Sequence, residues 1–131
     1  MIGLDTNVLV RYVMQDDLRQ AQQATRLVES LSSENPGFVS LVALVEFVWV
    51  LESCFGLDRA QLTAAVEGVL RTQELVVEHA EMVWKAVRLY RAGSADFADH
   101  VIERSAASAG CGQTMTFDQR AAKTGGMTLL K

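Results

Sequence analysis

The chain has 131 residues, of which 50% are hydrophobic and 21% charged, which is typical of a single soluble domain with one core. Its net charge of −4 excludes a protein that grips nucleic acid through a broad basic surface. Bound metal ions can still reverse the field within a local site. The cysteines Cys54 and Cys111 show no motif spacing, so the sequence predicts neither a disulfide framework nor a zinc site and favours a reducing cytoplasm.

No segment of the sequence has the features of a membrane span or a targeting signal. The pattern of structured elements begins at Met1, so we expect no signal peptide. The longest apolar run, from Phe38 to Leu51, is interrupted by Ser40 and Glu46 and is too short to cross a bilayer. We therefore expect no membrane partner, and we place most of this run in a core helix.

Short apolar runs alternate with segments of helical spacing along the whole chain. Asp58 and Gln61 have the spacing of a capping box, and the pair Gly125-Gly126 predicts a turn. The predicted elements, in chain order, are a strand at 1–4, helices at 7–14 and 15–33, a strand at 37–40, helices at 41–54 and 59–70, a strand at 75–77, helices at 80–91 and 96–109, a strand at 114–117, a helix at 119–123 and a strand at 127–130.

This alternation predicts a single α/β domain over residues 1–131, built as a sandwich around a mainly parallel sheet. In such sheets, ligands bind outside the carboxyl ends of the strands. Asp5 directly follows the first predicted strand, and Asp118 directly follows the strand at 114–117. If these strands are parallel neighbours, both carboxylates lie at one edge of the sheet.

Three further acids stand in unusual places. Glu46 lies in a strongly apolar helix, where a charge is costly unless it is paired, protonated or bound to a metal. Asp96 and Asp99 are three residues apart and share one face at the start of their helix. Taken singly, the aspartates are simply explained as helix caps or first-turn acids, and Glu46 as one half of an ion pair or as facing solvent.

Taken together, these acids favour a metal site over independent caps. Carboxylates that converge on one edge would repel one another and raise each other's pKa, and a divalent cation removes that penalty. The set contains no cysteine and no histidine cluster, so it favours Mg²⁺ or Mn²⁺ over zinc.

Four pieces of sequence, in this order, resemble the PIN-domain nucleases. They are L-D-T-N at 4–7, Glu46 in its apolar helix, D-F-A-D-H-V-I-E-R-S-A at 96–106, and T-F-D at 116–118. The chain is similar in particular to the VapC-like toxins of bacterial type II toxin–antitoxin pairs, and this resemblance covers essentially its whole length. It implies a three-layer α/β/α sandwich with a mainly parallel central sheet.

The resemblance also implies roles for individual residues. Asp5, Glu46, Asp99 and Asp118 match the four acids of the family and are the expected catalytic residues and ligands of Mg²⁺ or Mn²⁺, with Glu46 either a ligand or a general base. The expected auxiliary residues are Asp96, Thr6, Asn7 and Thr116. Weaker candidates for substrate binding are the basic residues Arg11, Arg104, Arg120 and Lys123, although such residues more often balance local acids.

The implied function is that of a metal-dependent endoribonuclease in the cytoplasm, acting as a toxin. Its implied partners are an RNA substrate, a cognate antitoxin that covers the acidic site, and a second copy of the chain. His100 is expected on a helix surface, and Trp49 and Trp84 are expected in the core or an interface rather than as platforms for base stacking.

Two other classes of function compete with the nuclease. A phosphoaspartyl hydrolase would use Asp5 as a nucleophile, but that chemistry looks for a second acid two residues later, where this chain has Asn7. A non-catalytic α/β binding module would use the same acids as caps and surface charge. Metal titration separates these hypotheses, because four converging carboxylates are stabilised by Mn²⁺ and an array of caps gains little.

Overall fold

The structure is a computed structural model that describes residues 1–131, and the chain has two compact units, Met1–Ala80 and Glu81–Lys131. The first unit alternates strands and helices in the order β1 (Ile2–Gly3), α1 (Thr6–Met14), α2 (Leu18–Glu29), β2 (Gly37–Val39), α3 (Leu41–Phe55), α4 (Arg59–Arg71) and β3 (Leu75–Val77). The elements of the second unit are α5 (Ala80–Ala92), α6 (Phe97–Ser108), β4 (Met115–Thr116), α7 (Gln119–Thr124) and β5 (Thr128–Leu129).

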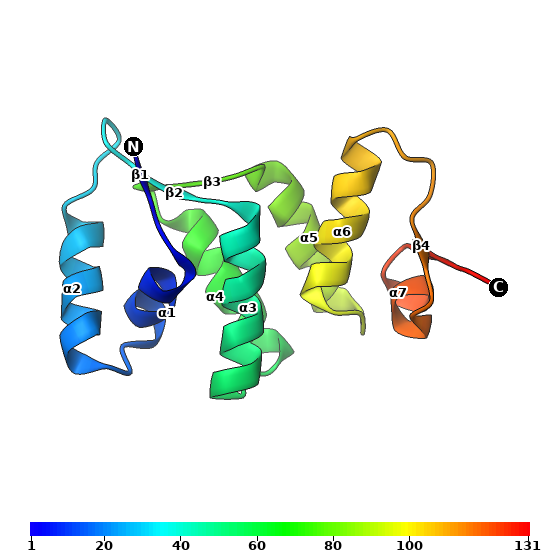
Figure 1. Cartoon of the computed structure of the whole chain (residues 1–131), viewed down its shortest axis with the longest axis horizontal. Helices are drawn as coiled ribbons and strands as arrows, with labels where there is room; N and C mark the ends of the chain where they lie inside the picture. The colour runs from blue at the N-terminus through cyan, green and yellow to red at the C-terminus, as the bar shows by residue number, and fades with distance from the viewer. The chain divides into compact units, whose positions relative to one another are not determined.

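The sheet of the first unit is entirely parallel, in the order β1-β2-β3 (Figure 1). Gly3 pairs with Phe38, and Phe38 pairs with Val76. The carboxyl ends of the three strands therefore meet at one edge. Both α1 and α3 begin at this edge and pack against each other as they leave the sheet.

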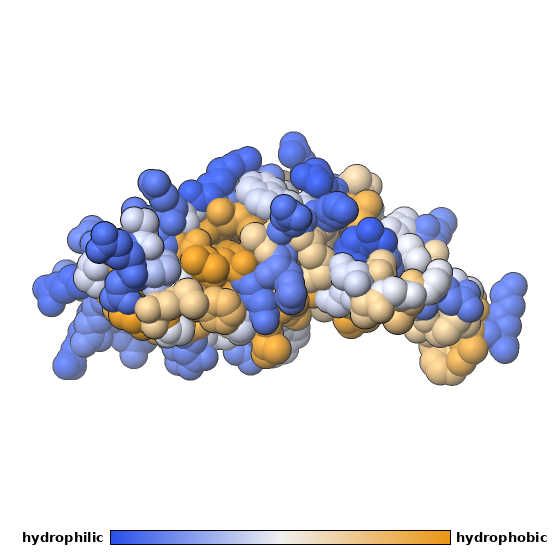
Figure 2. Space-filling view, turned by 90° about the horizontal axis from the view of Figure 1, so that it is seen from above, coloured by the Kyte–Doolittle hydropathy of each residue, from blue (hydrophilic) through white to orange (hydrophobic).

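The apolar sides of these helices form the core of the first unit. Its largest fully buried side chains are Leu9, Leu44, Phe47, Leu51 and Leu62. The opposite side of α3 is open to solvent even though it is apolar in places. Val42 is 79% exposed and Trp49 is 63% exposed, so Trp49 lies outside the core, and of its two expected places only the interface remains. Seen from the side of the strands, further apolar residues reach the surface (Figure 2), and Ile2 and Val76 are partly exposed.

The second unit is held together by α5 and α6 and by the parallel pair β4 and β5. The Tyr90 and Phe97 rings meet edge to face at 5.9 Å, and the His100 ring lies 6.5 Å from Tyr90. His100 is fully buried, which corrects its expected place on a helix surface. The α6 helix carries apolar residues on both sides of this position, and the packed tyrosine shields the imidazole.

The local signals in the sequence are confirmed in detail. Asp58 and Gln61 form the predicted capping box of α4, and Gly56 ends α3 with a φ of 65°. Gly126 has a φ of 75°, and a Cβ there would lie 2.9 Å from Glu103 Oε1, so this turn requires glycine. No helix is both long and apolar enough to cross a membrane. The extent of the single domain over 1–131 stays a prediction.

Candidate active site

Asp5 is the N-cap of α1, and its side chain leaves one oxygen available. Asp5 Oδ1 accepts a hydrogen bond from the Thr6 N–H at 2.8 Å, and the backbone is extended at this residue. An ordinary cap accepts from the second or third residue of the helix, whereas this one reaches only the first. Oδ2 makes no hydrogen bond and the side chain is exposed, so the acid serves as a cap and is still able to bind a ligand.

Glu46 lies one helical turn into α3 and is exposed, with no hydrogen bond or ion pair to its carboxylate. The sequence suggests a charge forced into an apolar environment, and that premise is wrong. The apolar neighbours Phe47 and Val48 turn into the core, and Glu46 lies on the other side of the helix. The Glu46 carboxylate therefore has no structural partner that would compete with a ligand.

Asp5 and Glu46 line the same cavity, which we call the acid cavity. It has a volume of about 450 Å³ and lies between the start of α1 and the exposed side of α3. Its polar lining consists of Asp5, Thr6, Asn7, Arg11, Asp16 and Glu46. The rest of its wall is formed by Val10, Val50, Cys54 and Phe55. The structure thus brings together two of the four predicted acids and two of the predicted auxiliary residues.

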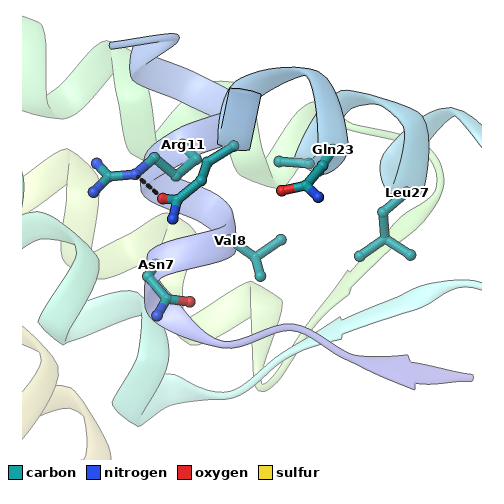
Figure 3. Close-up of a pocket in the computed structure, with 7 residues that line it drawn as sticks. Asn7, Val8, Arg11, Gln23 and Leu27 are labelled. Carbon is teal, nitrogen blue, oxygen red and sulfur yellow. Dashed lines mark hydrogen bonds between the residues drawn. The ribbon is translucent and has the colours of Figure 1, made fainter. Parts of the chain in front are cut away.

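Arg11, like Asn7, also lines a second cavity of about 260 Å³ between α1 and α2 (Figure 3). Its Nε donates to Gln20 at 2.7 Å, and its Nη1 donates to both oxygens of Asp16. Val8 on α1 and Leu27 on α2 also line the second cavity. Arg11 is therefore held in place by neighbours on its own unit, with Nη2 left without a partner.

The acids of the second unit lie at the starts of two helices. Asp96 is the N-cap of α6, and Asp99 accepts a hydrogen bond from the Asp96 N–H at 3.3 Å. Burial raises the pKa of the half-buried Asp99 carboxyl, and the nearby carboxylates of Asp96 and Asp118 raise it further, while the hydrogen bond and His100 act in the opposite direction. Asp96, Asp99 and Asp118 thus form one acidic group within the second unit.

Asp118 is the N-cap of α7 and is exposed. Its Oδ1 accepts hydrogen bonds from the N–H groups of Arg120 and Ala121, at 2.8 and 3.2 Å. The Thr116 hydroxyl accepts from the Asp118 N–H at 3.0 Å and so fixes the backbone that carries this acid. As at Asp5, one carboxylate oxygen is used for capping and the other is not.

The predicted basic residues fall into two groups. Arg104 binds Glu103 through two hydrogen bonds, at 3.0 and 2.7 Å, which raise the pKa of Arg104. Arg11 and Arg104 thus balance local acids. Arg120 and Lys123, on the short helix α7, are exposed and make no side-chain ion pair or hydrogen bond, so they are open to an anionic ligand.

The carboxylates fit a hard divalent cation of the magnesium type. No group of three His, Cys, Asp or Glu side chains is placed to hold an ion by itself. Mg²⁺ needs fewer, because it keeps several waters and binds through one or two carboxylates together with substrate phosphates. Asp5, Glu46 and Asp118 each offer an exposed carboxylate oxygen without a partner, and burial, followed by the neighbouring carboxylates of Asp96 and Asp118, raises the pKa of Asp99.

Sequence reasoning missed two features of this site. Glu78 directly follows β3 and accepts a hydrogen bond from the Leu41 N–H at 2.8 Å, at the start of α3. Its place after a strand is the signal that already singled out Asp5. The apolar wall of the acid cavity was missed as well, although Glu46, Val50 and Cys54 follow one another at intervals of four along α3.

Comparison with protein families gives one match, the PIN domain, over residues 2–127. Comparison with curated proteins gives no match. The family match covers nearly the whole chain and includes all four acids that carry the resemblance seen in the sequence. PIN domains are in general nucleases, and these commonly depend on divalent metals.

Proposed function

The chain belongs to the PIN domain family, and on that premise we propose that it is a metal-dependent endoribonuclease whose reaction uses Asp5, Glu46, Asp99 and Asp118. The observation that carries this proposal is Glu46, an exposed carboxylate without a partner that shares a cavity with Asp5. What sets Glu46 apart from Glu52, the other exposed acid of α3, is that it lines this cavity and Glu52 does not.

The residues that would hold a divalent ion are Asp5, Asp99 and Asp118, with Glu46 either as a further ligand or as a general base. A bound ion lowers the pKa of water and neutralises charge on the phosphate that is attacked. Glu46 is free to take a proton from the attacking water, since nothing else engages its carboxylate. Thr6 and Asn7 flank Asp5 in the acid cavity, and Thr116 holds the backbone of Asp118.

Binding of the RNA backbone falls to Arg120 and Lys123 in this proposal. Both are exposed, both follow Asp118 on α7, and neither has an ion-pair partner. Contacts of this kind position a nucleic acid without reading its sequence. Arg11 and Arg104 contribute less, because Asp16 and Glu103 already engage them.

We further propose that the protein is a toxin in the cytoplasm, that it forms a homodimer, and that a cognate antitoxin covers its acidic site. The resemblance of its motifs to VapC-like toxins is the support for the toxin role and for the antitoxin. Support for a protein partner comes from Val42 and Trp49, two large apolar side chains that are exposed two turns apart on α3. Light scattering of the purified protein tests the dimer, and growth arrest on expression, relieved by the product of a neighbouring gene, tests the toxin.

The nuclease is tested by cleavage of total RNA with the wild type and with Asp5→Asn, in Mg²⁺, in Mn²⁺ and in EDTA. Asparagine keeps the size of the side chain and its capping ability while removing the charge of the ligand. We expect cleavage that requires metal and falls by at least about 100-fold in the variant. Absence of cleavage by a wild type that binds neither metal nor RNA would favour the binding module instead.

A further inference from the structure

The acid cavity is larger than a site for a metal ion and a phosphate requires. Its volume of about 450 Å³ falls within the range of about 300–1,000 Å³ that is usual for pockets that hold small organic ligands. The acids Asp5 and Glu46 take up only one end of it. The remaining volume lies beside residues with no part in metal binding, so it has room for a further part of a ligand.

The wall of the cavity changes in character along the helices. The lining residues on α3 are, in order, Glu46, Val50, Cys54 and Phe55. At a rise of 1.5 Å per residue, Glu46 and Cys54 are about 12 Å apart along the helix axis. Across from them on α1, Asp5 is followed by Val10 and then by Arg11. Asp5 and Glu46 thus lie toward the starts of the two helices, and Val50, Cys54 and Phe55 lie further along α3.

Two features at the far end suit a nucleobase. Phe55, the last residue of α3, is half-buried and lines the cavity, so the wall contains an aromatic side chain, the type on which nucleobases stack. Arg11 and Asp16 are fixed by their mutual hydrogen bonds, at 2.9 and 3.2 Å, and keep a donor at Nη2 and spare acceptor capacity on the carboxylate. An aromatic side chain for stacking, together with a fixed hydrogen-bond donor on Arg11 and acceptor on Asp16, is the combination of groups that recognises the edge of a base.

We propose that the acid cavity holds one nucleotide of the RNA substrate, with its phosphate toward Asp5 and Glu46 and its base between Val50 and Phe55, beside Arg11 and Asp16. The proposal rests on the proposed nuclease function and adds a pocket that recognises a base. The carboxylates of Asp5, Asp16 and Glu46 outnumber the guanidinium of Arg11, so an anionic phosphate enters only together with a divalent cation. The base is uncharged, so its binding at the other end of the cavity does not require a cation.

Cys54 makes this pocket measurable without any cleavage. Its thiol is free and exposed, and it lines the cavity between Val50 and Phe55. A nucleotide bound there covers it. Cys111 is also free and exposed but belongs to the second unit, so it serves as an internal reference. The rate at which iodoacetamide alkylates each cysteine in the full-length protein reports on occupancy of the pocket.

The experiment measures these rates in Mg²⁺ with guanosine 5′-monophosphate and with ribose 5-phosphate, which lacks the base. We expect the nucleotide, at about ten times its Kd, to slow the labelling of Cys54 about tenfold and to leave Cys111 unchanged. Ribose 5-phosphate should protect Cys54 far less. Equal labelling with and without the nucleotide, or equal protection by both compounds, would overturn the proposal.

A pair of variants on α3 provides the matched control. Phe55→Leu keeps an apolar side chain and removes the stacking surface, and we expect it to weaken protection by the nucleotide about tenfold or more. Trp49→Leu removes a larger aromatic ring from the same helix, at a position outside the cavity, and should leave protection unchanged. Comparable losses in both variants would contradict a base site at Phe55.

The labelling assay and the cleavage assay fail independently. Protection of Cys54 without cleavage of any RNA would support the nucleotide pocket and count against the nuclease. Metal-dependent cleavage in the wild type, with no protection and with an unchanged set of cleavage sites in Phe55→Leu, would support the nuclease and overturn the pocket.

Discussion

The two units of the chain handle their acids in different ways. In the first unit, Asp5 and Glu46 stand on separate helices, α1 and α3, and face a cavity with an apolar wall. In the second unit, Asp96 and Asp99 share the start of α6, and the carboxylates of Asp96 and Asp118 help to raise the pKa of Asp99. The first arrangement offers space for a substrate, and the second gathers negative charge. The family match, which covers the acids of both units, is the reason that we assign them to one proposed nuclease.

The largest effect that we expect comes from Glu46→Gln in the first unit. The variant should lose at least about 100-fold in the rate of RNA cleavage, because the amide can neither take a proton nor bind a metal as a carboxylate does. Its thermal unfolding should be unchanged, since Glu46 is exposed and has no partner.

Glu52→Gln is the matched control for this change, because Glu52 is an exposed carboxylate further along the same helix and outside the acid cavity. It should cleave RNA as the wild type does. Equal rates of cleavage by Glu46→Gln and Glu52→Gln would contradict a role for Glu46 in the reaction.

The two paired arginines provide a second contrast between the units. In Arg104→Met, the carboxylate of Glu103, whose side chain is only 11% exposed, loses its partner, and we expect about 1–3 kcal/mol less unfolding free energy. In Arg11→Met, the broken pair is 31% and 33% exposed, and the loss should stay below about 1 kcal/mol. Urea unfolding measures both. A larger loss for Arg11→Met would reverse this ranking of the units.

A smaller effect is expected from the exposed basic residues of α7. The double variant Arg120→Gln/Lys123→Gln should bind single-stranded RNA several-fold more weakly, and the slope of log K against log salt should fall by about 1.4, because each phosphate contact contributes about 0.7. The control is Arg19→Gln/Arg26→Gln on α2, where two exposed arginines line neither of the two cavities. An unchanged salt slope in the α7 variant would separate these residues from RNA binding.

The smallest effect concerns the raised pKa of Asp99. Because the folded state holds this proton more tightly than the unfolded chain, ionised Asp99 lowers stability at neutral pH, and the penalty disappears below its ordinary pKa of 3.8. Asp99→Asn should therefore unfold at a slightly higher temperature than the wild type at pH 7 in EDTA, and the gain should vanish near pH 3. A gain that grows on acidification would have the wrong sign.

The sequence predicted the elements well because their signals are local. Asp58 with Gln61 and the pair Gly125-Gly126 are recognised from their neighbours alone, and the structure confirms both. Burial was harder to predict, because the side of a helix that faces the core depends on what packs against it. His100 was misplaced for this reason, and the sequence could not choose between the core and an interface for Trp49, or between burial and solvent for Glu46.

The candidate site was predictable in part. Asp5 and Asp118 follow strands, and that position alone marked them as residues at a site. The sharing of a cavity by Asp5 and Glu46 depends on how α1 packs against α3, which spacing within one segment does not reveal. Asp16 and Phe55 joined the site in the same way, through the meeting of two helices.

The most direct test of the central claim is a double-mutant cycle on the rate of RNA cleavage in Mg²⁺, with Asp5→Asn, Asp118→Asn and the double variant. Residues that act as one catalytic unit are strongly non-additive, so we predict that the double variant loses no more activity than the more damaging single change. Losses that multiply, or an Asp118→Asn protein as active as the wild type, would contradict a single reaction served by both acidic groups.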